Sequence, residues 1–120
     1  MERTVLEALR AMRPPFVLYE ADIHAMVGEC LAQNGLPFTH EARLGGGCRI
    51  DYLVGDVGVE IKKGKPNATL LCRQLNRYAM CDQVAALVVV TWQSVALPVS
   101  LCGKPVRALV LGQLWGVSLP

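Results

Sequence analysis

Three residues near the middle of the chain have the types and spacing that suit hydrolysis of a phosphate ester. Asp51 lies in one alternating segment, and Glu60 and Lys62 lie near the end of the next. Gly55 and Asp56 separate the two segments as a two-residue hairpin turn. That turn places Asp51 directly opposite Glu60, and residues opposed in this way have Cβ atoms about 4.5–5.5 Å apart.

Opposed carboxylates repel each other unless a cation lies between them. Mg²⁺ prefers oxygen ligands and commonly uses one or two carboxylates, which leaves positions for water and phosphate. Lys62 follows Glu60 by two residues and so lies on the same strand face, where its ammonium group would meet that water or phosphate. The alternative is an ordinary exposed hairpin on which Lys62 and Arg49 neutralise both acids. The pairing also depends on the turn length.

The order of the motifs resembles the PD-(D/E)xK nuclease superfamily. Asp51 and the triplet Glu60-Ile61-Lys62 match its D…(D/E)xK pattern, with Ile50 where proline is usual. Downstream, the segment from Gln74 to Tyr78 matches the QxxxY motif of the RecB-type branch. His24, on a helix upstream, is placed like the metal-binding histidine of that branch.

Other features look similar to the Holliday-junction resolvases of the same superfamily. These features are the short hairpin, the glycines at 45–47 and the small size of the chain. Resolvases usually carry a helix glutamate where the RecB-type branch has histidine. Glu20 lies one turn before His24, so the helix ligand is either His24 or Glu20.

The resemblance implies a role for each matching residue. The implied ligands of Mg²⁺ or Mn²⁺ are His24 or Glu20, Asp51, Glu60 and the backbone carbonyl of Ile61. Lys62 is the implied catalytic lysine, and Gln74 and Tyr78 would orient it or the phosphate backbone. Basic residues flank these positions and are either ordinary solvated charges or phosphate contacts; we expect the latter for Arg49, Lys63, Lys65, Arg73 and Arg77.

The expected activity is therefore hydrolysis of a DNA phosphodiester by a metal-activated water. One alternative is a structure-selective Holliday-junction-type endonuclease. Another is a non-catalytic DNA-binding or assembly module on the same fold. A third is an interaction domain in which the motifs are coincidental.

Hydrophobic periodicity predicts helices over 2–13, 20–33 and 69–82, and strands over 37–43, 49–54, 57–62, 84–91 and 106–111. Ile50, Tyr52 and Val54 should share one face of their strand. The order is αβββαβ, which indicates an α/β fold with a mixed sheet flanked by helices. The resemblance implies a restriction-endonuclease-like core. We expect an N-terminal helical arm over 1–15 and a single nuclease-like domain over 16–120.

Composition sets the remaining expectations. A chain of 120 residues that is 52% hydrophobic suits one domain with a real core. Residues 1–60 carry a net charge of −4 and residues 61–120 carry +6, so a basic region follows the acidic one. The five cysteines show no CxxC spacing, which argues against an iron–sulfur cluster and fits a reducing compartment. We expect a cytoplasmic protein without a membrane segment, of phage or mobile-element type. We also expect it to bind DNA and to form a homo-oligomer, with a dimer favoured and a further protein partner open.

Overall fold

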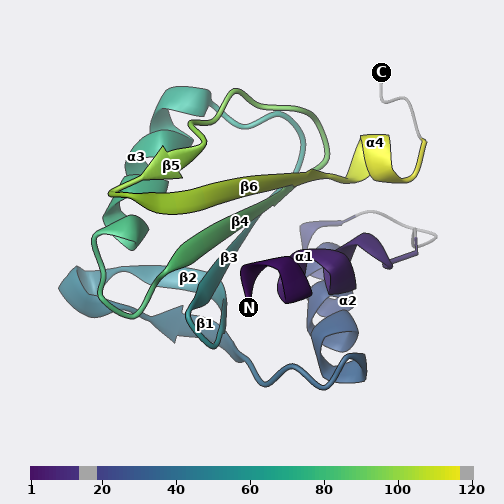
Figure 1. Ribbon diagram of the computed structural model, residues 1–120. Coiled ribbons are helices and arrows are strands. Elements are labelled where there is room, and N and C mark those ends of the chain that lie inside the picture. The colour runs from purple at the N-terminus through teal and green to yellow at the C-terminus, as the bar shows by residue number, and fades with distance from the viewer. Residues whose placement is uncertain (14–18, 117–120) are drawn as a thin grey trace.

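The computed structural model, which describes residues 1–13 and 19–116, is a mixed α/β fold built on a six-stranded sheet flanked by helices (Figure 1). The strand order is β1-β2-β3-β4-β6-β5. Strands β1 to β3 are antiparallel neighbours, β3, β4 and β6 are parallel, and β5 returns antiparallel to β6. The elements in chain order are α1 (Glu2–Arg10), α2 (Glu20–Gln33), β1 (Thr39–Arg43), a 3₁₀ turn (Gly45–Gly47), β2 (Arg49–Val54), β3 (Val57–Lys62), α3 (Ala68–Ala79), β4 (Ala86–Thr91), β5 (Ser100–Leu101), β6 (Lys104–Val110) and α4 (Leu111–Leu114).

The predicted mixed sheet with flanking helices is confirmed, and α2, β2 and β3 have the predicted bounds, whereas the other predicted elements shift at one or both ends by one to three residues. Helices α1 and α3 each end three residues before the predicted limit, at Arg10 and Ala79. Strand β6 begins two residues early, at Lys104, and Leu111 starts α4 rather than ending the strand. The predicted boundary between an N-terminal arm and the main domain, at residues 15 and 16, lies outside the described residues.

Two apolar clusters hold the layers together, one on each face of the sheet. Helices α1 and α2 pack on one face, and α3 packs on the other, as Figure 1 shows. Strand β4 lies between them, and all six of its residues are buried, as expected for a parallel strand covered on both faces. Its alternate side chains enter the two clusters, with Val88 and Val90 under α1 and α2 and Leu87 and Val89 under α3.

No helix among residues 1–13 and 19–116 is long and apolar enough to cross a membrane.

Candidate active site

The β2–β3 hairpin has the predicted turn, and it has the predicted register as far as Tyr52 and Val59, but Asp51 and Glu60 do not form the next regular pair. Val54 pairs with Val57, and Tyr52 pairs with Val59. Beyond that pair the regular ladder stops, because the Asp51 side chain takes over one of its hydrogen bonds. The Ile61 N–H donates to Asp51 Oδ2 at 2.8 Å, and the Asp51 N–H lies 3.4 Å from Glu60 Oε1. The hairpin therefore brings the two acids together.

A change of strand faces accompanies this break in the ladder. His40 pairs with Tyr52 and Ala42 pairs with Ile50, while the intervening Glu41 has a left-handed φ of 53°. Tyr52 packs in the cluster under α2, whereas Ile50 packs in the cluster under α3. The prediction that Ile50, Tyr52 and Val54 share one face is therefore wrong for Ile50, because strict alternation fails where the backbone kinks.

Glu60 is the buried acid of the site. Only 3% of its surface is exposed. Burial, together with the neighbouring Asp51 carboxylate, raises the pKa of Glu60 from its ordinary 4.5 to about 7, although Lys62 opposes this rise. The side chain is thus poised to gain or lose a proton, or to accept a cation, close to neutral pH.

Lys62 is the closest cation to this buried acid. Its Nζ lies 3.2 Å from Glu60 Oε2, and 30% of its side chain remains exposed. The predicted alternation of β3 is confirmed here, because Glu60 and Lys62 meet on one face. An ammonium group with one side on a carboxylate and the other toward water can contact a phosphate or hold a water molecule.

The first candidate helix ligand, His24 on α2, also reaches the site. Its Nε2 lies 3.9 Å from Asp51 Oδ2, and 21% of its side chain is exposed. Tyr52 fixes this turn of the helix, since its buried hydroxyl donates to the His24 carbonyl at 2.6 Å. Glu20, the alternative ligand, is exposed at the start of α2 and forms no hydrogen bond or ion pair with the described residues. The geometry therefore favours His24.

Gln74 and Tyr78 form a hydrogen-bonded pair on α3. Gln74 Nε2 donates to the Tyr78 hydroxyl at 2.8 Å, and that hydroxyl donates to the Arg49 carbonyl at 3.0 Å. Burial raises the pKa of Tyr78, and the Glu60 carboxylate adds to the rise, so the hydroxyl stays protonated. The pair ties α3 to the first residue of β2, two residues before Asp51.

All five predicted basic residues are exposed, but only Arg49 and Arg77 border the depression beside Tyr78. The structure places Arg49 and Arg77 with Gln74 and Tyr78 around a depression of about 340 Å³ that the glycines at 46 and 47 also line. Lys63 Nζ lies 5.6 Å from the centre of the exposed Tyr19 ring. Arg73 and Lys65 are exposed outside this depression.

Thr91 is a residue of this region that sequence patterns did not single out. It ends β4 directly beside Lys62 in the parallel register. It is fully buried, and its hydroxyl has no hydrogen-bond partner among the described residues. In the sequence, Thr91 stands out as the polar last residue of an apolar strand. Only the strand register shows that it neighbours Lys62.

The chemistry of the donor set fits a small divalent cation. A buried carboxylate beside a second carboxylate repels it in the absence of a positive charge, and Lys62 meets only one of the two. A cation held by Asp51 and Glu60 would reverse the sign of that interaction. The described side chains do not gather three His, Cys, Asp or Glu groups closely enough to make a complete metal centre. The Ile61 carbonyl and His24 as further ligands therefore stay predictions.

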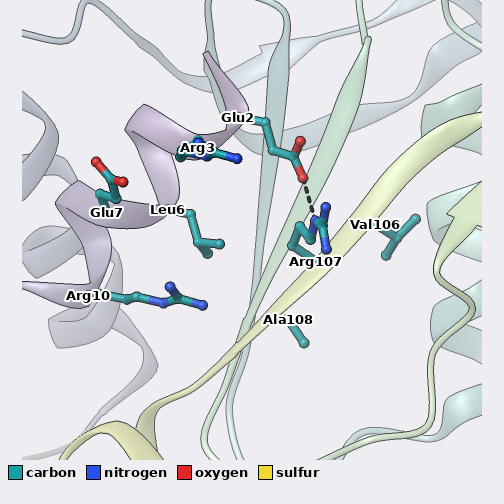
Figure 2. Close-up of a pocket in the computed structure, with 8 residues that line it drawn as sticks. All are labelled: Glu2, Arg3, Leu6, Glu7, Arg10, Val106, Arg107 and Ala108. Atoms are coloured by element: carbon teal, nitrogen blue, oxygen red, sulfur yellow. Dashed lines mark hydrogen bonds and ion pairs between the residues drawn. The ribbon is translucent and has the colours of Figure 1, made fainter.

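A larger groove, of about 630 Å³, lies elsewhere, between α1 and β6 (Figure 2). Leu6 and Arg10 extend from α1 toward β6, and Arg107 Nε pairs with Glu2 Oε2 at 2.7 Å. Side chains of both charges line it together with the apolar Leu6, Val106 and Ala108, and Glu7 points away. Of its two carboxylates, Glu2 is paired with Arg107 and Glu7 points away, and no residue of the matching motifs lines it, so the candidate chemistry belongs to the Asp51–Glu60 site.

Comparison of the chain with models of protein families, with curated proteins and with solved structures finds no match. Function must therefore be inferred from the residues and their geometry.

Proposed function

We propose that this protein is a metal-dependent nuclease that hydrolyses DNA phosphodiester bonds, on a restriction-endonuclease-like fold of the PD-(D/E)xK type. The observation that carries the proposal is the meeting of Asp51, Glu60 and Lys62 at the end of the β2–β3 hairpin. A buried carboxylate beside a second carboxylate is costly to stability. Such an arrangement is common where a site needs it for binding or catalysis.

Each residue then has a task. Asp51 and Glu60 would hold Mg²⁺ or Mn²⁺, which when bound makes water more acidic and neutralises charge on the phosphate. Lys62 would orient the attacking water and offset the negative charge that develops as the phosphodiester is cleaved. The Gln74–Tyr78 pair would keep the start of β2, and so Asp51, in position.

Exposed basic residues near the site would set the direction from which the substrate approaches. Arg49 and Arg77 border the depression next to Tyr78, and Lys63 and Lys65 follow β3 directly. Backbone phosphates are the anions these side chains would contact, because phosphate contacts position nucleic acids without reading their sequence.

The deciding experiment is cleavage of labelled single-stranded, duplex and four-way-junction DNA with Mg²⁺ or Mn²⁺. Lys62→Ala should cut at least about 100-fold more slowly, the lower range for loss of a group that stabilises negative charge in the transition state. Lys104→Ala is the matched control, since Lys104 lies on β6, which β4 separates from β3, and donates to the Cys81 carbonyl. Cutting that is equal in both variants would refute the role of Lys62, and absence of cutting of every DNA would refute the nuclease assignment. Tight binding without cutting would support a non-catalytic module.

A further inference from the structure

We propose that Phe38 and His40 form a stacking platform for unpaired bases of single-stranded DNA beside the candidate active site. This inference rests on the proposed function and adds to it the class of substrate. The platform lies on and just before β1, the edge strand of the sheet.

Tyr52 is the fixed base of the platform. It is only 3% exposed, and its hydroxyl is held by the His24 carbonyl. The His40 ring stacks on it with a centroid distance of 4.4 Å and an interplanar angle of 15°. Phe38 meets the same ring edge-on at 5.3 Å. Both outer rings are therefore held in place before any ligand arrives.

The outer rings face solvent despite this support. Phe38 is 37% exposed, one of few large apolar side chains on the described surface with that much exposure, and His40 is exposed as well. Since one face of the His40 ring lies on Tyr52, its opposite face is the one left open. An open, supported aromatic face is what a stacked base requires, and such stacking tolerates any base because every base has a π-face.

The platform leads directly to the carboxylates. The His24 ring lies 5.7 Å from the His40 ring, and His24 Nε2 lies 3.9 Å from Asp51. A strand whose bases stack along Phe38 and His40 would therefore bring its next phosphate toward Asp51 and Glu60.

The negative charge near Phe38 and His40 favours contact with a base over contact with a phosphate. The exposed Glu41 follows His40 directly, and Asp51 lies beyond His24. Without a bound cation these acids repel a phosphate but not the uncharged face of a base, whereas a cation held by Asp51 and Glu60 would attract the next phosphate of the strand. Duplex DNA keeps its bases stacked on one another, so it offers the platform nothing to bind. The geometry thus favours a single strand, a frayed end or an unpaired flap.

The test is binding of a 15-nucleotide single strand and a duplex of equal length, each labelled and carrying 2-aminopurine. Ca²⁺ replaces Mg²⁺, and a gel confirms that the strands stay intact. Phe38→Ala and His40→Ala should each weaken single-strand binding about fivefold or more, the lower range for loss of one stacked base. Duplex binding should stay within twofold. His40→Tyr keeps an aromatic ring and should retain both the affinity and the quenching of 2-aminopurine fluorescence.

Two controls separate the outcomes. Val99→Ala removes an apolar side chain that is 85% exposed, the highest value among the large apolar residues of 1–13 and 19–116. Val99 lies next to β5, at the opposite edge of the sheet, and its loss should change neither binding nor fluorescence. Thermal unfolding of each variant checks that Tyr52 still packs. An equal loss of affinity for single strand and duplex, or no loss of affinity in either alanine variant, would overturn the platform. DNA cleavage by the wild type would still support the nuclease in that case. Absence of both binding and cleavage for every DNA would overturn the two proposals together.

Discussion

Replacement of the buried acid by its neutral isostere should stabilise the protein without metal and abolish its response to metal. In Glu60→Gln the side chain keeps its shape and an oxygen that can accept from the Asp51 N–H. What it loses is the ionised form, which burial and Asp51 destabilise. The rise of the Glu60 pKa from 4.5 to about 7 corresponds to about 3 kcal/mol, at about 1.4 kcal/mol for each tenfold change in proton affinity. The opposing effect of the Lys62 ion pair is already included in this net shift, so a gain of about 3 kcal/mol is expected above pH 7.

The pH dependence has a definite sign. Because the folded-state pKa of Glu60 is raised, the native protein keeps a proton that the unfolded chain releases between pH 4.5 and about 7. The free energy of unfolding of the wild type should therefore fall, relative to Glu60→Gln, as the pH rises through that window. The two proteins should be about equally stable at pH 4.5 and differ most above pH 7.

Urea unfolding from pH 4.5 to 8.5, with EDTA and then with Mn²⁺, measures both effects. Mn²⁺ should raise the stability of the wild type above that of its EDTA sample, because a ligand of the native state stabilises it, and should leave Glu60→Gln unchanged. Glu29→Gln, the same change at an exposed site on α2, should follow the wild type throughout. A Glu60→Gln protein no more stable than the wild type at pH 8 would show that the ionised Glu60 carboxylate does not destabilise the fold. A cation between Asp51 and Glu60 would then have no repulsion to relieve.

Three further substitutions test the scaffold by urea unfolding. Asn67→Ala removes the side chain that accepts from the Leu70 N–H at 3.0 Å and caps α3, and should cost about 1 kcal/mol; an unchanged midpoint would mean that the cap is not formed. Gly28→Ala places a Cβ 2.8 Å from the Tyr52 hydroxyl and should cost about 1–3 kcal/mol, whereas a neutral effect would show that α2 can shift away. Tyr52→Phe leaves the His24 carbonyl without its 2.6 Å donor, and a loss of about 1–2 kcal/mol is expected; a smaller loss would indicate that water reaches this carbonyl.

The sequence alone determined the local elements that carry their own signals. Helix α2 runs over 20–33 as the apolar spacing predicts. Asn34 caps its C-terminus, and Gly35 follows with a left-handed φ of 67°. The turn at 55–56 and the register of the hairpin were also predictable, because a two-residue turn fixes which residues face each other. From that register the proximity of Asp51 and Glu60 followed without any tertiary information.

Tertiary structure decided what depends on contacts between distant segments. The change of face at Ile50 arises from the kink at Glu41 on the neighbouring strand, which alternation within β2 does not reveal. The burial of Glu60, and with it the raised pKa, depends on the layers packed around β3. The stacking of His40 on Tyr52, and the position of Thr91 beside Lys62, depend on strand pairing across at least 11 residues of sequence. Spacing along the chain fixes neighbours within a helix or a hairpin, but burial and contacts across the sheet exist only once the layers have packed.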